Sequence, residues 1–153
     1  MIFKVKPTND VYVSRQDVNN PLSSFSKYSF QLDDAEWPSA EHYYQAMKFE
    51  DDAIREKIRQ APHPKDTVKL AKQYKKQIRK DWDSIKATVM KRGTYIKCRT
   101  HKEVATALLK TGDKTIVENS QFDYYWGCGR DGRGENTYGK TLMDIRDKLS
   151  ELK

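Results

Sequence analysis

A concentration of glycine near the end of the chain limits what this sequence can fold into. Five of its seven glycines lie between Gly127 and Gly139, within residues 126–141 (WGCGRDGRGENTYGKT). Glycine loses more conformational entropy on folding than any other residue, so a regular helix or strand does not favour such a cluster. The cluster predicts a loop in which the backbone closely approaches another group.

Two nucleotide-binding patterns can be read in this loop, and both lack the surroundings they need. Residues 127–132 match GxGxxG, which requires a flanking strand and helix and an acidic residue about 20 positions further on. Residues 134–141 match GxxxxGK[ST], which serves a parallel sheet with a downstream metal-binding Asp, yet only twelve residues follow Thr141. Both patterns are therefore rejected.

A glycine-rich loop can bind an anion even where neither of these nucleotide-binding folds is present. A glycine-rich backbone that leads into a helix N-terminus presents N–H groups to an anion, and Arg130 and Arg133 add charge suited to phosphate. The alternative is an exposed turn that binds nothing.

Length and composition indicate one globular domain over residues 1–153. The chain can bury a substantial core, and its 37% hydrophobic and 11% aromatic content argues against disorder. No apolar run approaches the roughly 20 residues of a membrane span, and the N-terminus lacks the apolar stretch of a signal peptide. Two cysteines give no disulfide framework and three histidines no metal-ligand spacing. We expect a cytoplasmic protein with no metal, no cofactor and no membrane association.

The net charge of +7 raises the question of an anionic partner. Eight lysine and arginine residues fall between Lys65 and Lys86. One interpretation is a solvated helix face. The other is attraction of a phosphorylated or nucleic-acid partner. No RNA-binding aromatic motif or zinc finger accompanies the charge, so the sequence does not support base-specific reading.

Hydrophobic periodicity predicts a helix-rich α+β domain with a small sheet. Strands are expected at residues 2–5, 11–13, 28–32 and 116–117, with a turn at 33–34. Helices are expected from the N-cap Ser39 to about residue 50, over about 66–80, and onward from Trp82. Thr100 and Glu103 form a capping box for a helix that Gly112 ends, and leucines and Ile145 between 142 and 152 predict a C-terminal helix.

Four polar side chains are spaced to share one face of the first predicted helix: Glu41, Tyr44, Gln45 and Lys48. A carboxylate and a lysine two turns apart can be two solvated charges. Together in a site they can carry acid–base or nucleophilic chemistry.

Three blocks of sequence occur together, in order, along nearly the whole chain. The first is residues 21–25 (PLSSF) followed by 37–49 (WPSAEHYYQAMKF), and the second is residues 78–82 (IRKDW). The third runs from Glu118 through DYYWG at 123–127 and GxGxNxxG at 132–139 to Leu142 and Met143. In combination these blocks resemble the NADAR family, also called YbiA-like N-glycosidases. That resemblance implies a single α+β domain.

The resemblance implies cleavage of an N-glycosidic bond between a phosphorylated ribose and an exocyclic amine. In the YbiA-like branch the substrates are phosphoribosylated aminopyrimidines of riboflavin biosynthesis. In other branches the substrate is ADP-ribose on guanine of nucleic acid, for which the basic segment at 65–86 is the argument here. A third hypothesis is a non-catalytic ADP-ribose-binding module, although a mere binder need not keep the lysine–carboxylate pair.

The resemblance also implies roles for particular residues. Lys48 matches a catalytic lysine that could form a Schiff base with the ring-opened sugar, while Glu41 moves protons. In the competing mechanism Glu41 or Asp123 activates water against an oxocarbenium-like centre, and Lys48 only neutralises charge. The resemblance and the glycine-rich loop together suggest the substrate-binding residues, of which Trp126 would act by stacking. They are Ser24, Tyr44, Trp126, Gly127, Gly129, Arg130, Arg133 and Asn136. The chain departs from the family pattern at Ser24, Cys128 and Tyr138, which puts the choice of substrate in question more than the reaction type.

Overall fold

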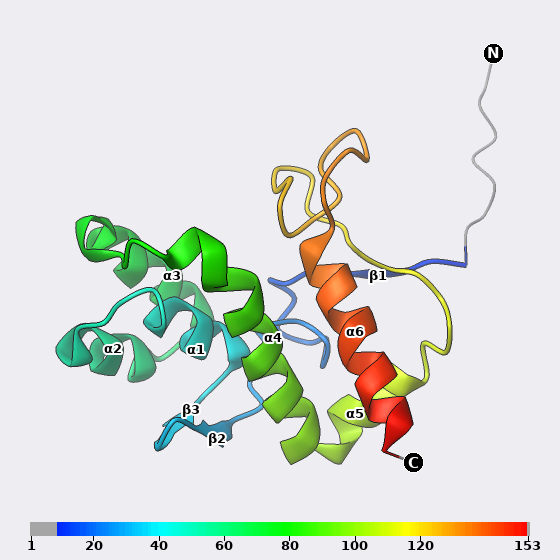
Figure 1. Cartoon of the computed structure of the whole chain (residues 1–153), viewed down its shortest axis with the longest axis horizontal. Helices are drawn as coiled ribbons and strands as arrows, with labels where there is room; N and C mark the ends of the chain where they lie inside the picture. Colours follow the sequence, from blue (N-terminus) through cyan, green and yellow to red (C-terminus); the bar gives the residue numbers. More distant parts are fainter. Residues whose placement is uncertain (1–8, 153) are drawn as a thin grey trace.

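The computed structural model describes residues 9–152, which form an α+β domain dominated by helices (Figure 1). Its elements are, in order, β1 (Val11–Val13), β2 (Phe30–Leu32), β3 (Ala35–Trp37), α1 (Ala40–Ala46), α2 (Asp52–Arg59), α3 (Pro64–Gln73), the 3₁₀ helix η1 (Lys75–Gln77), α4 (Trp82–Thr100), α5 (Lys102–Leu109), β4 (Ile116–Glu118) and α6 (Thr137–Glu151). The predicted fold class is confirmed. The strand expected at residues 2–5 lies outside the described residues.

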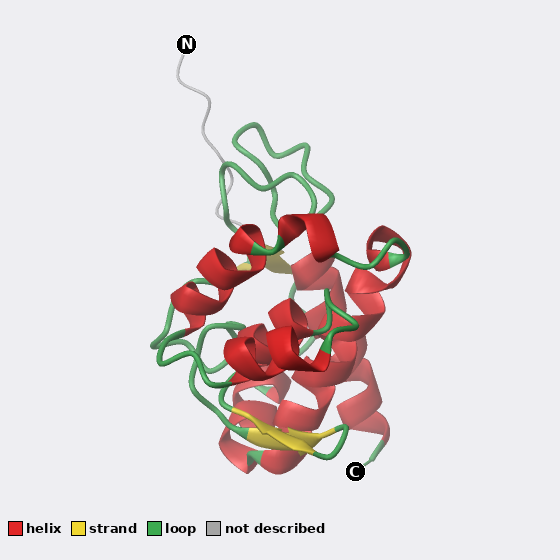
Figure 2. Ribbon diagram, turned by 90° about the vertical axis from the view of Figure 1, so that its left-hand side faces the viewer, coloured by secondary structure: helices red, strands yellow, loops and turns green. Residues whose placement is uncertain are grey.

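The strands form two separate pairs and not one sheet (Figure 2). β2 and β3 make an antiparallel hairpin whose two turn residues, Asp33 and Asp34, have φ of 53° and 62°. Positive φ at both central positions is what a two-residue hairpin turn of type I′ requires. β1 pairs in parallel with β4, with Val11 opposite Ile116 and Val13 opposite Glu118. This second pair brings together segments about a hundred residues apart in sequence. The residues that follow its two strands form part of the candidate site.

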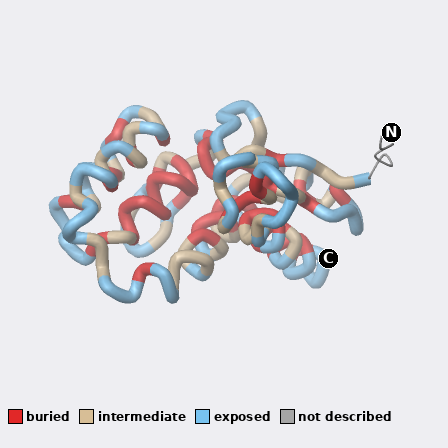
Figure 3. The backbone as a smooth tube through the Cα atoms, turned by 90° about the horizontal axis from the view of Figure 1, so that it is seen from above, coloured by how far each residue is buried: buried red, intermediate tan, exposed pale blue. Residues whose placement is uncertain are grey.

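Helix α1 is enclosed by neighbouring elements, and every one of its seven residues is buried. The hydroxyl of Ser39 caps it by accepting a hydrogen bond from the His42 amide, as predicted. Helices α2, α3 and α4 pack around α1. Exposed positions gather on the outer helices and loops, while buried positions run through the middle (Figure 3). A polar residue on α1 is therefore held in a buried setting.

Several predicted helix boundaries were wrong. Helix α1 ends at Ala46 and not near residue 50. Asp51 caps a further helix, α2, which was not predicted from the sequence. The predicted helix over 66–80 is divided into α3 and η1. Thr100 is the last residue of α4 and its hydroxyl donates to the Ile96 carbonyl, so the predicted capping box does not form.

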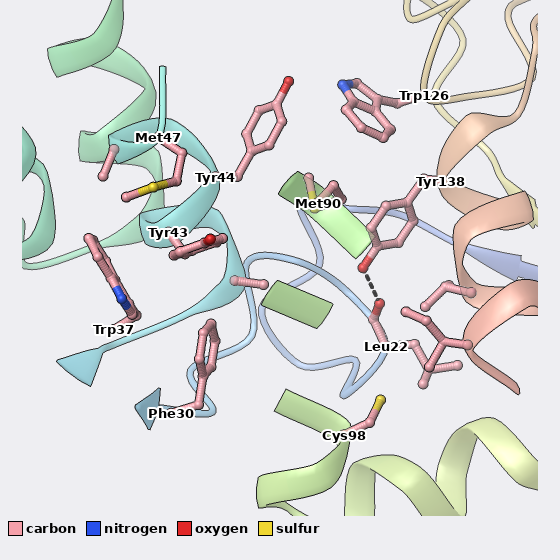
Figure 4. Packing of buried hydrophobic residues seen from close by; sticks show 14 of the residues in the cluster. Leu22, Phe30, Trp37, Tyr43, Tyr44, Met47, Met90, Cys98, Trp126 and Tyr138 are labelled. Atoms are coloured by element: carbon pink, nitrogen blue, oxygen red, sulfur yellow. Dashed lines mark hydrogen bonds between the residues drawn. The ribbon is translucent and has the colours of Figure 1, made fainter. Parts of the chain in front are cut away.

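Aromatic side chains fill the core on both sides of α1 (Figure 4). Trp37 and Tyr43 meet edge to face with ring centroids 5.4 Å apart. On the other side Tyr44 faces Trp126, and the Tyr138 hydroxyl donates to the Leu22 carbonyl. This second aromatic group borders the candidate site.

Candidate active site

A cavity of about 360 Å³ lies where the segments that follow β1 and β4 meet α1. Because the two strands are parallel, the residues after both of them emerge at the same edge, the usual place for a ligand. Arg15 and Gln16 come from the segment after β1, and residues 120–123 from the segment after β4. Helix α1 adds Glu41 and Gln45, and Phe25 and Val68 complete the wall.

The carboxylate of Glu41 is the most strongly bound group of this cavity. Its Oε1 accepts hydrogen bonds from Arg15 Nη2 at 2.8 Å and from Ser24 Oγ at 2.7 Å, and its Oε2 accepts one from Gln45 Nε2 at 2.7 Å. The Glu41 side chain is fully buried and that of Arg15 is 13% exposed. The amide of Glu41 also donates to the Ser24 carbonyl. The cavity therefore has a rigid ion pair in its wall.

These contacts decide the ionisation of Glu41. Burial by itself would raise the pKa of its carboxyl group, but the charge of Arg15 and the donors on Gln45 and Ser24 outweigh burial and lower the pKa. Glu41 is consequently an anion at neutral pH. An ionised carboxylate can accept a proton or stabilise a developing positive charge, whereas donating a proton from this position is disfavoured.

Lys48 lies two residues past the C-terminal end of α1, so the predicted helix does not reach it. Its side chain is not among those that line the cavity walls, although the charges of Glu41 and Arg15 act on it. Its Nζ is 5.4 Å from the centre of the Tyr44 ring. Burial lowers the pKa of the Lys48 amine, and the nearby cations Arg15, Lys86 and Lys72 lower it further against the opposing charge of Glu41. A lowered pKa increases the fraction of neutral amine, the form that acts as a nucleophile.

Asp123 lines the cavity from the segment after β4 and has two roles in the structure. Its Oδ1 accepts hydrogen bonds from the amides of Tyr125 and Trp126, which fixes the turn after β4. Its Oδ2 lies 4.0 Å from Arg15 Nη1. Arg15 therefore lies within ion-pair distance of both Glu41 and Asp123.

Trp126 and Tyr44 lie beneath Arg15. The guanidinium carbon of Arg15 is 5.1 Å from the centre of the Trp126 ring and 5.6 Å from that of Tyr44. Both aromatic residues are almost completely buried, with Trp126 only 6% exposed. In this structure they support the Arg15 side chain by cation–π contact. The predicted stacking of Trp126 on substrate stays a prediction.

The glycine-rich loop folds back on itself. Residues 124–128 run beside residues 134–138, with hydrogen bonds from Gly134 N to Cys128 O and from Glu135 N to Tyr124 O. A Cβ on Gly134 would lie 2.2 Å from the Gly127 carbonyl oxygen, so only glycine fits there. The close approach that the glycines were predicted to allow is therefore made to another part of the same loop.

The amides at the start of α6 are already used by this loop. Those of Asn136, Thr137 and Tyr138 donate to the carbonyls of residues 127, 125 and 126. The Gly129 amide likewise donates to the Ser120 carbonyl. These particular amides do not point at a bound anion, and the roles of Gly127 and Gly129 in substrate binding stay predictions.

The remaining loop residues differ in their positions. The Asn136 side chain accepts from the Glu118 amide and donates to the Ile116 carbonyl, so Asn136 shapes the loop. Arg130 and Arg133 are exposed and do not line the cavity; Arg133 lies 3.5 Å from Asp131. Their contact with a phosphate stays a prediction.

Of the ten residues that line the cavity, only Glu41 and Asp123 were predicted from the sequence as site residues. The other eight are Arg15, Gln16, Phe25, Gln45, Val68, Ser120, Gln121 and Phe122. Arg15 lies in no recognised block, and only the parallel pairing of β1 with β4 brings it to Glu41. A usable signal existed in the polar residues directly after each of two short strands, Ser14-Arg15-Gln16 and Asn119-Ser120-Gln121. That signal becomes informative only when the two strands are known to be parallel neighbours.

The described residues also bear on metals and membranes. Residues 9–152 contain no group of three or more His, Cys, Asp or Glu side chains arranged to hold a metal ion. No helix in that range is both long and apolar enough to cross a membrane.

Comparisons with known proteins identify relatives over most of the chain. N-glycosidase Npun_R5314 of Nostoc punctiforme is 41% identical over 134 residues, which cover 86% of each protein. N-glycosidase YbiA of Escherichia coli is 35% identical over 139 residues, 91% of this chain and 87% of that protein. The riboflavin biosynthesis protein VVA0006 of Vibrio vulnificus is 37% identical over 142 residues, 92% of this chain but 39% of that longer protein.

Structural comparison agrees with the sequence comparison. The NMR structure of Escherichia coli YbiA superposes with a TM-score of 0.83 at 33% identity, covering 97% of this chain and 89% of that one. These relatives confirm the predicted enzyme class, a glycosidase acting on N-glycosyl compounds. The NADAR domain family matches residues 11–150. This chain therefore belongs to the NADAR family.

Proposed function

We propose that this chain hydrolyses the N-glycosidic bond between ribose 5-phosphate and the exocyclic amine of aminopyrimidine intermediates of riboflavin biosynthesis. The observation that carries the proposal is the ionised, fully buried Glu41 carboxylate in the wall of a polar cavity. Cleavage of such a bond builds positive charge at the anomeric carbon, and a fixed anion in a low-dielectric site stabilises that charge. The relatives named as N-glycosidases and riboflavin biosynthesis proteins support this choice of substrate.

Lys48 is the proposed nucleophile. The sugar opens to an imine at its anomeric carbon, and the neutral Lys48 amine adds to that carbon. The aminopyrimidine leaves with the electron pair of the broken C–N bond and takes up a proton, so that a Schiff base joins Lys48 to the sugar. Water then adds to this Schiff base and releases ribose 5-phosphate and the free lysine. Glu41, as the nearby anion, accepts the proton in the addition step.

The competing route needs no covalent intermediate. Water attacks an oxocarbenium-like centre, activated by Glu41 or Asp123, both of which line the cavity. Lys48 would then only balance charge. The two routes differ in whether a bond to Lys48 ever forms.

Borohydride reduction during turnover is expected to attach the sugar covalently to Lys48. Mass spectrometry of peptides would locate the added mass. A Lys48→Arg variant keeps the positive charge but supplies no neutral amine, so it is expected to lose the label and at least about 100-fold in kcat. Lys102→Arg, at an exposed lysine of α5 that does not line the cavity, serves as the control and is expected to keep both. Normal turnover by Lys48→Arg would rule out the Schiff base.

A second candidate function is removal of ADP-ribose from guanine in nucleic acid. Its support is the position of the basic segment. Helix α3 contributes Val68 to the cavity wall, and its lysines 65, 69 and 72 are exposed. A strand of nucleic acid that placed a modified base in the cavity would meet this positive charge.

A comparison of substrates separates these functions. The purified protein would be given a phosphoribosylated aminopyrimidine and ADP-ribosylated guanosine in parallel, with release of free base followed by chromatography. We expect the higher kcat/KM on the aminopyrimidine. A higher value on the guanosine adduct would favour the second function, and tight ADP-ribose binding without turnover would favour a binding module.

A further inference from the structure

Phe122 is the most exposed large hydrophobic residue of the described chain. Its side chain is 88% exposed, yet it belongs to the cavity lining at the turn after β4. An aromatic ring left in water at the mouth of a polar cavity has an open face for a flat ligand. Trp126, the residue predicted to stack, is only 6% exposed and has Arg15 over its ring.

Gln45 supplies a second unexplained feature of the same cavity. Its Nε2 donates to Glu41 Oε2, and this orientation is fixed because an ionised carboxylate can only accept hydrogen bonds. The opposite atom, Gln45 Oε1, is buried and has no hydrogen-bond partner anywhere in residues 9–152. A buried acceptor without a donor is costly, so a ligand N–H that reached it would remove that cost.

We propose that Phe122 and Gln45 form the subsite for the leaving group, a planar amino-substituted heterocycle. Phe122 stacks on the ring at the mouth of the cavity, and Gln45 Oε1 accepts a hydrogen bond from the exocyclic N–H. This assignment deepens the proposed function and rests on it. It also places the departing nitrogen beside Glu41, to which Gln45 is already bound.

The stacking half of the proposal is tested by calorimetric titration with two products, the free aminopyrimidine and ribose 5-phosphate. Phe122→Ala is expected to weaken binding of the aminopyrimidine by at least about five-fold, since stacking of a base on an aromatic side chain is worth that much or more. Binding of ribose 5-phosphate is expected to stay unchanged. Phe122→Tyr keeps the ring and is expected to bind both products as the wild type does.

Tyr124→Ala is the matched control for Phe122→Ala. Tyr124 is also exposed, lies two residues away and does not line the cavity. It is expected to bind both products normally. If Phe122→Ala weakens both products equally, or neither, the stacking role is refuted.

The hydrogen-bonding half is tested with a pair of ligands and a pair of proteins. The wild type is expected to bind the aminopyrimidine more tightly than the same pyrimidine with hydrogen in place of the amine. Gln45→Met removes the acceptor and is expected to bind the two ligands with equal affinity. Continued preference of Gln45→Met for the amine would refute the role of Oε1.

Failure of the subsite and failure of the proposed function give different results. Wild-type turnover of the phosphoribosylated aminopyrimidine tests the function alone. If guanine binds instead of the aminopyrimidine and its binding depends on Phe122 and Gln45, the proposed substrate is wrong and the subsite is retained. If neither base depends on these residues, the subsite is refuted whatever the enzyme cleaves.

Discussion

Replacing Glu41 with glutamine is expected to lower kcat by about 100- to 1,000-fold and to destabilise the protein by about 3 kcal/mol. The catalytic loss follows because a neutral amide cannot stabilise positive charge at the anomeric carbon. The loss of stability follows because Arg15, whose side chain is only 13% exposed, would lose the carboxylate that balances its charge. Steady-state kinetics and urea unfolding measure the two effects separately.

A double variant distinguishes catalysis from folding. Arg15→Met with Glu41→Leu removes both charges and replaces them with apolar side chains of similar size. Removing a buried pair together costs much less than breaking it, so stability is expected to recover most of the loss. Activity is expected to stay at the level of Glu41→Gln or below. Recovery of activity together with stability would show that the pair is structural only.

The free energy of unfolding is expected to increase with pH between about 7 and 10.5 because of Lys97. This lysine of α4 is fully buried, and its Nζ donates to the Ser23 carbonyl and to Ser26 Oγ, both at 2.8 Å. Burial lowers the pKa of Lys97 from 10.5 to about 7. Between these values the unfolded chain binds one more proton than the folded chain, so raising the pH favours the folded state.

The expected gain attributable to Lys97 is about 2 kcal/mol between pH 7 and pH 9. The penalty is fully present below pH 7, where both states are protonated, and has vanished above pH 10.5, where neither is. Unfolding curves of the wild type and of Lys97→Met, collected over this range, give the contribution as a difference. Lys91→Met, a partly exposed lysine of the same helix, is expected to keep the wild-type pH dependence. A constant difference between the wild type and Lys97→Met would contradict the prediction.

Lys97 also supports the candidate site. The turn that it holds carries Ser24, which donates to Glu41, and Phe25, which lines the cavity. Burying a lysine whose hydrogen-bond acceptors are uncharged lowers the stability of the fold. In this position the lysine holds the turn that supplies Ser24 and Phe25 to the candidate site. Nothing in the local sequence distinguishes Lys97 from the other lysines and arginines of α4.

Local patterns were sufficient for those parts of the fold that depend on near neighbours in the chain. The Ser39 cap, the turn at Asp33 and Asp34, the strand at β4 and the C-terminal helix are confirmed because a few consecutive residues decide each of them. The Thr100 capping box failed because α4 continued through it. Helix α4 packs against α1, α5, α6 and β2, and such tertiary packing overrides a local preference.

The sequence by itself determined the family, the helix-rich α+β class and the helix face that carries Glu41, Tyr44 and Gln45. Only the tertiary structure decided what surrounds that face. The parallel pairing of β1 with β4 brings Arg15 to Glu41, and the glycines serve a loop that packs on itself. The physical reason is that hydrogen-bonded patterns within a helix or turn are set by adjacent residues. An ion pair between residues 26 positions apart depends on strand pairing that spans about a hundred residues.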